Sequence, residues 1–510
     1  MAFAFVLSEG LPPEQFNLFR HQPVAGAFAV IVGQISMIVA TAWLGRLRTL
    51  ARLDHTIEGH EEAADRLSAT HHVILWMLAI TLTLTMVCTP WIPLVRSMDG
   101  LARVPLAAEL VILMPFFAAL GLAWIVLYEP EVRLRREARA LEAAQQQTVS
   151  EPPDSSLGSY LVDKFRHQVL IVAAPMSAIV LVKFFTNMLK PQLARHRIEW
   201  LADSILGCTS VVVLFLSPVI LRYVWSTQPL PEGPLRERFK GICRRIGLKY
   251  REILLWRTHG MAVNAAVMGF VPPLRYILVS DALLTTMRDE EIEAVFGHEA
   301  GHVRHWHLHF FGLFALLSMY VAGGVMELLL LTPLRNDLAM MNLIALSVLM
   351  GCWLFGFGWL SRKFERQADL FGIRCITPDV QNCTTWCPVH GSPPAAVASN
   401  GLCVSAANIF GRTLLKIADL NGIPRHAPSW RHGSIDSRCN LIEQFTVDAE
   451  RLRKFDRLLW WLKAGLLILA VVGTFLAVII WYPRIAPALF EALGWTRHGH
   501  GPRGRLFPTN

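Results

Sequence analysis

The residue pattern with the clearest chemical content is His298-Glu299-Ala300-Gly301-His302, an H-E-x-x-H sequence. Residues four apart share one face of an α-helix, so both imidazoles could point at one metal ion. Glu299 would lie on the same side of the helix, where it could take a proton from a zinc-bound water. Zinc suits this arrangement because it holds two histidines and a carboxylate tetrahedrally and leaves the fourth position for water. We therefore predict a catalytic zinc helix; the alternative is a polar helix face with two solvated histidines.

The residues around the motif support a helix that begins with acidic side chains. Residues 289–291 are all acidic, which the helix dipole favours in a first turn. Ile292, Val295 and Phe296 would give this helix an apolar side. We expect the helix to continue into the long apolar run that follows, which would place the motif at a membrane surface.

A third zinc ligand is expected beyond the next two apolar segments. Residues 361–369 contain Glu365 and Asp369, which are four apart on one helical face. If the two apolar segments form a transmembrane hairpin, Glu365 returns to the side of the membrane where the histidines lie. We predict that Glu365 binds zinc and that Asp369 hydrogen-bonds a ligand histidine and fixes its tautomer. The alternatives are an ion pair of Glu365 with the neighbouring Arg and Lys, and a surface carboxylate for Asp369.

The composition indicates a polytopic membrane protein. Of 510 residues, 53% are hydrophobic and 16 are Trp, and the mean hydropathy is +0.41. Several apolar runs reach the roughly 20 residues that a helix needs to cross a bilayer. We predict eight spans, at residues 24–44, 73–95, 105–128, 169–189, 203–224, 308–331, 341–360 and 459–482. The formal charge of +9 does not indicate nucleic-acid binding, because Lys and Arg collect on the cytoplasmic side of membrane proteins.

Basic residues predict the orientation of the chain. The loops after the first, third and fifth predicted spans are rich in Lys and Arg, and all three lie on one side if the spans alternate. The positive-inside rule makes that side cytoplasmic, together with the H-E-x-x-H motif and residues 361–456, and puts both chain ends on the other side. Lys190, Arg195 and Arg197 count against this orientation.

The predicted fold is a predominantly α-helical polytopic membrane protein with a cytoplasmic, zincin-like α+β catalytic domain built around a helical hairpin. Residues 235–249 predict a basic amphipathic helix, either a membrane-surface helix or a solvated helix face. Residues 261–270 and 275–280 predict short strands, and a sheet edge beside a zinc helix could accept an extended peptide as an added strand. The expected parts are an N-terminal membrane region (1–224), a catalytic segment (225–307), a transmembrane hairpin (308–360), a second catalytic segment (361–457), a last transmembrane helix (458–482) and a tail (483–510).

Four blocks of the sequence resemble the integral-membrane zinc metallopeptidases of the HtpX and type I CAAX prenyl protease group. Residues 264–269 are similar to the family's N-A-x-x-x-G strand, and residues 280–284 to the strand-to-helix step that follows it. The H-E-x-x-H helix is similar to the family's zinc helix, and residues 361–369 to its S-R-x-x-E-x-x-A-D block. The resemblance covers about residues 263–438.

The resemblance implies a role for each matched position. The zinc ligands and the general base would be those already predicted from the motifs. Asn264 and Ala265 would hold the substrate backbone. His432 would stabilise the oxyanion and Arg438 would be a structural partner, although Gly433 stands where the family usually has proline. A solvated loop histidine is the alternative for His432.

Residues 372–406 depart from the family and contain several thiols. Cys375, Cys383, Cys387 and His390, with Cys403 nearby, could bind a second, structural zinc. Plain loop cysteines are the alternative. A disulfide is not expected on a reducing cytoplasmic side, and nine Cys do not form a secreted disulfide framework.

The predicted function is that of a zinc endopeptidase acting on membrane proteins or membrane-tethered peptides, with protein quality control as the first expectation and CAAX processing as the second. A sensor-type receptor, and a non-catalytic scaffold or transporter, are rivals from other classes. The expected partners are a protein or peptide substrate and the lipid bilayer, without nucleic acid. Substrate identity, cleavage preference and oligomeric state stay open.

Overall fold

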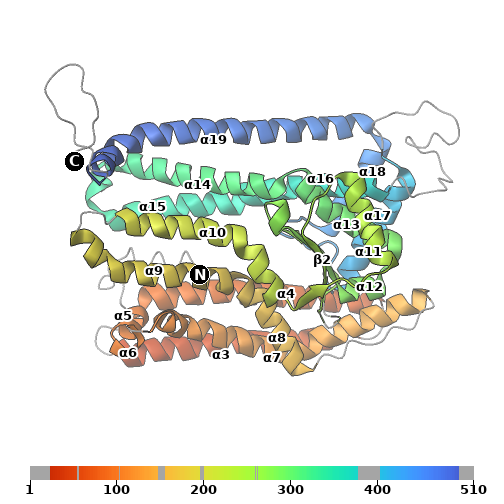
Figure 1. Cartoon of the computed structure of the whole chain (residues 1–510). Helices are drawn as coiled ribbons and strands as arrows, with labels where there is room; N and C mark the ends of the chain where they lie inside the picture. The colour runs from red at the N-terminus through yellow and green to blue at the C-terminus, as the bar shows by residue number, and fades with distance from the viewer. Residues whose placement is uncertain are drawn as a thin grey trace, which may run out of the picture.

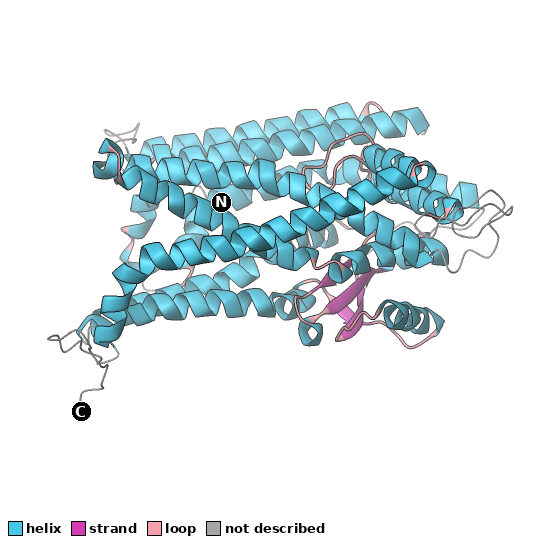
Figure 2. Ribbon diagram, turned by 90° about the horizontal axis from the view of Figure 1, so that it is seen from above, coloured by secondary structure: helices cyan, strands magenta, loops and turns pink. Residues whose placement is uncertain are grey.

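Long apolar helices make up most of the computed structural model (Figures 1 and 2). It describes residues 23–53, 57–102, 104–146, 156–195, 200–258, 260, 262–376 and 402–492. Within these ranges, eight helices are long and apolar enough to cross a membrane, which confirms the predicted helical membrane fold and the number of spans. The cytoplasmic position of the catalytic part stays a prediction. They are Val24–Leu50, Gly59–Met86, Ala107–Leu141, Leu157–Arg195, Ser204–Val224, His307–Leu330, Met340–Ile376 and Ala449–Ile480.

The N-terminal part is a bundle of long helices with two short ones at a turn. Its elements are α3 (Pro23–Leu50), α4 (Ile57–Cys88), α5 (Trp91–Arg96), α6 (Asp99–Ala102), α7 (Ala107–Gln146), α8 (Leu157–Lys164), the π-helix η1 (Phe165–Leu170), α9 (Ile171–Arg195) and α10 (Trp200–Val224). The predicted span at 105–128 is only the first part of α7. The helix continues because the residues beyond it are mostly Arg, Glu, Ala, Leu and Gln, which are good helix formers.

A four-stranded sheet lies at one end of the long helices (Figure 2). Its strands are β1 (Thr227–Pro229), β2 (Glu252–Trp256), β3 (Ala265–Met268) and β4 (Tyr276–Ser280). The order is β1-β2-β4-β3, with β2 and β4 parallel and the other pairs antiparallel. Every residue of β4 is buried, whereas β3 is an edge strand. The predicted strands at 261–270 and 275–280 correspond to β3 and β4.

Two features of the sheet region follow directly from sequence. Gly269 ends β3 at φ +113°, and a Cβ atom there would collide with the Leu274 carbonyl oxygen, so the last position of the N-A-x-x-x-G pattern requires glycine. The basic helix predicted at 235–249 is α11 (Pro234–Ile246). Its Arg236 and Arg238 pair with Glu252 and Glu293 of the same unit, so this basic face is engaged within the protein.

The rest of the chain alternates between the sheet unit and the membrane helices. Its elements are α12 (Asp281–Thr286), α13 (Asp289–Arg304), α14 (His307–Leu330), α15 (Leu338–Gly351), the π-helix η4 (Cys352–Phe357), α16 (Gly358–Ile376), α17 (Val404–Leu420), α18 (Ile435–Val447) and α19 (Ala449–Ala492), with short 3₁₀ turns at Pro272–Leu274 and Pro333–Asn336. In Figure 1, α14, α15 and α19 run side by side, and α13, α16, α17 and α18 gather beside the sheet.

The expectation that the zinc helix continues unbroken into the membrane is wrong. The chain turns between α13 and α14, where Trp306 takes the left-handed conformation with φ 61°. This turn redirects the apolar run and lets His307, the first residue of α14, lie in the protein interior.

Candidate metal centre and catalytic cavity

The two helices that carry the predicted ligands lie against each other at close range. A Cβ atom on Gly297 of α13 would come within 2.9 Å of Cys375 Cβ and 3.0 Å of Gly372 Cα in α16. Gly372 faces α13 in the same way, because its Cβ would lie 3.1 Å from the Ala294 carbonyl oxygen. These glycines let the two backbones approach each other and bring ligands from both helices to one place.

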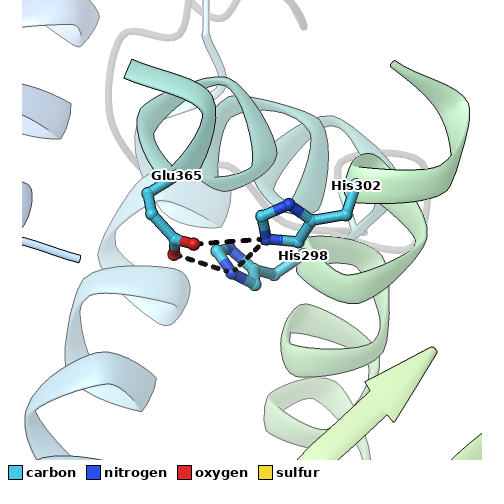
Figure 3. Close-up of side chains that lie close together, drawn as sticks. All are labelled: His298, His302 and Glu365. Atoms are coloured by element: carbon cyan, nitrogen blue, oxygen red, sulfur yellow. Dashed lines mark hydrogen bonds and ion pairs between the residues drawn. The ribbon is translucent and has the colours of Figure 1, made fainter. Parts of the chain in front are cut away.

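Three donor atoms converge at this contact. His298 Nε2 and His302 Nε2, one turn apart on α13, are 3.3 Å from each other. Glu365 on α16 completes the group, with Oε2 3.4 Å from His298 Nε2 and Oε1 3.6 Å from His302 Nε2. Figure 3 shows the two imidazoles and the carboxylate pointing toward one another. Among the residues that the structure describes, this is the one group of His, Cys, Asp and Glu arranged to hold a metal.

The separations fit zinc. Ligand atoms about 2.1 Å from a tetrahedral zinc ion lie about 3.4 Å from one another. The three observed separations of 3.3, 3.4 and 3.6 Å surround that value. Two imidazole nitrogens and one carboxylate form the donor set of a catalytic zinc site, which keeps its fourth position for water or substrate.

The candidate ligand His298 contacts a buried ion pair with its second ring nitrogen. Its Nδ1 lies 2.8 Å from Asp369 Oδ1, and Asp369 accepts two hydrogen bonds from Arg438, at 3.0 and 2.5 Å. Burial opposes charge on His298, but the carboxylates of Asp369 and Glu365 outweigh it and raise its pKa to about 10. The same negative charges would stabilise a dication in place of that proton. Arg438, 7% exposed, keeps Asp369 ionised and oriented.

The ligand His302 has a different environment. Burial, together with the charge on His298, lowers the pKa of His302 to about 3, so its ring is neutral and offers a lone pair. Its Nδ1 lies 2.9 Å from Nδ1 of His307, a residue outside the H-E-x-x-H motif that was not among the predicted site residues. A signal was present in the sequence, since His307 follows the second motif histidine by five residues, but only the turn at Trp306 brings the two rings together.

Glu299 lies beside the donor group and lines the same cavity. Burial raises the pKa of Glu299 to about 7, assisted by the negative charge of Glu365 and opposed by His298. The backbone of Val267 in β3 favours the charged form of Glu299 and so opposes this rise of the pKa. A carboxylate with a pKa near neutrality can accept a proton and release it again, which is what a general base requires.

His432 reaches the metal centre from a tight loop. Its Nδ1 lies 2.9 Å from Glu365 Oε2, and about half of the side chain is exposed toward the cavity. The loop is closed by two backbone hydrogen bonds between Ser429 and Gly433, and Gly433 has φ +78°. Trp430 anchors it by donating from Nε1 to the Leu354 carbonyl oxygen, 2.7 Å away in the π-helix η4.

The edge strand β3 borders the cavity. Asn264 and Ala265 line the cavity together with the metal donors, and its volume is about 480 Å³. The Asn264 carbonyl, just before β3, accepts a hydrogen bond from the Ser280 N–H of β4. The backbone N–H and C=O groups of Ala266 and Met268 therefore point toward β4, and those of Ala265 and Val267 point toward the free edge of the sheet. The outward N–H of Ala265 bonds to the Asn264 side chain, and the backbone of Val267 acts on the Glu299 carboxylate, so the free edge of β3 lies directly beside the predicted general base.

The predicted structural zinc site falls mostly outside the described residues. Cys383, Cys387 and His390 lie in the range 377–401, which the structure does not describe. Cys375 and Cys403 are buried at the ends of α16 and α17, and the Cys375 carbonyl accepts a hydrogen bond from Arg245. A second zinc therefore stays a prediction.

Comparison with known proteins gives one consistent result. Residues 229–413 match the model of peptidase family M48. A CAAX prenyl protease 1 homolog from Arabidopsis thaliana is 25% identical over 185 residues, which are 32% of this chain and 42% of that protein. A protease HtpX homolog from Archaeoglobus fulgidus is 26% identical over 178 residues, which are 33% of this chain and 50% of that protein. The crystal structure of Ste24p from S. mikatae has a TM-score of 0.51 over 87% of this chain and 99% of that chain, at 13% identity.

These comparisons confirm the resemblance predicted from the four sequence blocks. The aligned parts span half or less of the length of the two curated relatives. The likeness to Ste24p concerns the fold, and it extends over the N-terminal helices that the sequence blocks do not cover.

Proposed function

We propose that this chain, which is similar to the membrane metallopeptidases that include HtpX and the type I CAAX prenyl proteases, is a zinc-dependent endopeptidase of membrane-associated proteins. One observation carries the proposal. Donor atoms of His298, His302 and Glu365 converge at tetrahedral separations in a cavity that also contains a carboxylate with a raised pKa and a free strand edge.

The residues around the donor group supply the proton chemistry. Zinc, when bound by His298, His302 and Glu365, would polarise the scissile carbonyl and make a water molecule more acidic. Glu299 takes the proton of the attacking water and passes it to the leaving amine. The ring of His432 lies at the metal centre, with Nδ1 2.9 Å from Glu365 Oε2. From this position His432 donates an N–H to the oxyanion that develops on the scissile carbonyl.

The edge strand positions the substrate. An extended peptide donates to the outward carbonyl oxygens of Ala265 and Val267, because the Ala265 N–H is already bonded to Asn264, and its scissile bond then lies next to Glu299. The side-chain oxygen of Asn264 accepts from the Ala265 N–H, 2.9 Å away. Its amide nitrogen is then the group that remains to donate to a substrate carbonyl.

The membrane setting indicates the substrate class. The donor helix α13 is followed immediately by a membrane-spanning helix, so peptides tethered to the bilayer reach the cavity more readily than soluble ones. The basic loops predict that this end of the molecule faces the cytoplasm. Misfolded or cleaved membrane proteins are therefore the first substrates that we propose.

A second candidate is the processing of prenylated CAAX proteins. The Arabidopsis thaliana and Oryza sativa relatives both carry the name CAAX prenyl protease 1 homolog. The two candidates separate with one matched pair of peptides, a farnesylated CAAX peptide and its unprenylated version. Cleavage of the first alone would favour processing, and cleavage of unfolded membrane segments without a prenyl group would favour quality control.

The central experiment measures zinc content and peptide cleavage of the full chain purified in detergent. We expect one catalytic zinc in the wild type and in Glu299→Gln, but cleavage only in the wild type. Glu290→Gln is the matched control, since Glu290 is an exposed residue of the same helix and should leave both unchanged. A zinc-free wild type, or cleavage by Glu299→Gln at the wild-type rate, would refute the proposal.

A further inference from the structure

Behind the ligand His302, a chain of side chains leads to the last membrane-spanning helix. His302 Nδ1 lies 2.9 Å from His307 Nδ1, and His307 Nε2 lies 2.9 Å from Gln367 Oε1. Lys463 of α19 donates to the same Gln367 oxygen from 2.8 Å. His307 is fully buried, and its ring stacks on that of Phe364 with 4.3 Å between the ring centroids and 5° between the planes. Packing therefore fixes the position of His307 in this series of hydrogen bonds.

The lysine determines the direction of every hydrogen bond in this chain. An ammonium group only donates, so the Gln367 atom that faces Lys463 must be the oxygen. His307 Nε2 shares that oxygen and must therefore carry a proton. Full burial favours the neutral ring, which leaves His307 Nδ1 as an acceptor. His302 Nδ1 then donates to it, and His302 Nε2 keeps its lone pair for a metal.

The two ligand histidines are thus supported by different means. A carboxylate, Asp369, faces the Nδ1 of His298, whereas a neutral imidazole faces the Nδ1 of His302. The second support extends outward to α19. Lys463 also donates to the His305 carbonyl oxygen at 2.9 Å, at the end of the donor helix α13.

We infer that Lys463, Gln367 and His307 form a positioning relay that fixes the metal-binding tautomer of His302 and couples the last membrane helix to metal affinity. The inference rests on the proposed metal centre and goes beyond it, because none of these three residues is a metal ligand. Its consequence is that a change in α19, on a helix outside the catalytic unit, weakens zinc binding.

The test measures zinc affinity of the full chain in detergent by competition with a chelator, and the visible absorption bands of the cobalt-loaded protein, which report ligand geometry. We expect His307→Leu and Lys463→Met to lower zinc affinity by about 10- to 100-fold and to alter the cobalt bands. His307→Asn should recover most of the affinity, because its side-chain oxygen provides an acceptor near the position of Nδ1. Lys454→Met is the matched control, since Lys454 is an exposed residue of α19 that pairs with Glu450.

The outcomes separate the relay from the metal centre itself. A wild type that binds no zinc would refute the proposed function. A wild type that binds zinc, with His307→Leu and Lys463→Met binding it equally tightly, would overturn the relay alone. If His307→Leu does not fold, the comparison of His307→Asn with Lys463→Met decides. The relay requires that Lys463→Met binds zinc more weakly than His307→Asn does.

Discussion

The close approach of α13 and α16 makes one substitution especially informative. In Gly297→Ala the added Cβ would lie 2.9 Å from Cys375 Cβ and 3.0 Å from Gly372 Cα. Carbon atoms pack at about 3.5–4.0 Å, so the helices must separate by roughly 0.5–1 Å. Zinc sites tolerate ligand displacements of only about 0.2 Å. Glu365, the predicted third ligand, is on the helix that moves relative to the two histidines.

Two energies then compete in Gly297→Ala. Overpacking costs about 1–3 kcal/mol, and replacing glycine within a helix recovers about 1 kcal/mol. The net loss of folding stability is therefore small, at most about 2 kcal/mol. A misplacement approaching 1 Å at a catalytic site costs about 100-fold in rate. We expect a folded protein with weakened zinc binding and an activity about 100-fold lower.

The assay compares zinc affinity, cleavage rate and thermal unfolding of Gly297→Ala with those of Gly241→Ala. Gly241 is the control because it also lies inside a helix, α11, but a Cβ there meets nothing within 4 Å. Gly241→Ala should gain about 1 kcal/mol of stability and keep full activity. Wild-type zinc affinity in Gly297→Ala would show that the helix separation does not control the ligand geometry.

Two further substitutions test the surroundings of the centre. In Gly358→Ala the new Cβ collides with the Trp430 ring and displaces the loop that carries His432. We expect the zinc-loaded protein to keep its zinc content and to cleave peptide with a lower kcat. Arg438→Met leaves the buried Asp369 carboxylate without its guanidinium partner, and we expect a loss of about 3–5 kcal/mol in the free energy of unfolding. Arg438→Lys should restore only part of this loss, because a lysine cannot donate the two parallel hydrogen bonds of a guanidinium group.

The parts of the site that depend on local geometry could be predicted from the sequence. Two histidines four apart must share a helix face, so the meeting of His298 and His302 requires no knowledge of the fold. The return of Glu365 required one more step, a hairpin of two apolar runs. The eight spans were predictable for a similar reason, because length and hydropathy alone make a helix able to cross a bilayer.

The parts that depend on non-local packing could not be predicted. Strands β1 and β2 are three and five residues long, and their pairing joins segments far apart in the sequence, which no local pattern encodes. The turn at Trp306 was missed because a left-handed tryptophan is intrinsically unfavourable and has no sequence signature. His307 was missed for the same reason, since a straight helix would have carried it away from His302.

The unequal support of the two ligand histidines has an electrostatic consequence. Asp369 brings a negative charge to the back of His298, but Arg438 compensates it at hydrogen-bonding distance. His302 is supported by a neutral ring, which adds no charge. Glu365 is then the carboxylate that would face a bound dication directly, with Glu299, the predicted base, beside it. A second carboxylate behind His302 would increase metal affinity, but it would also reduce the positive charge that acidifies a water molecule. The neutral His307 ring holds His302 in place without adding a negative charge, and it leaves the positive charge of the metal available for the reaction.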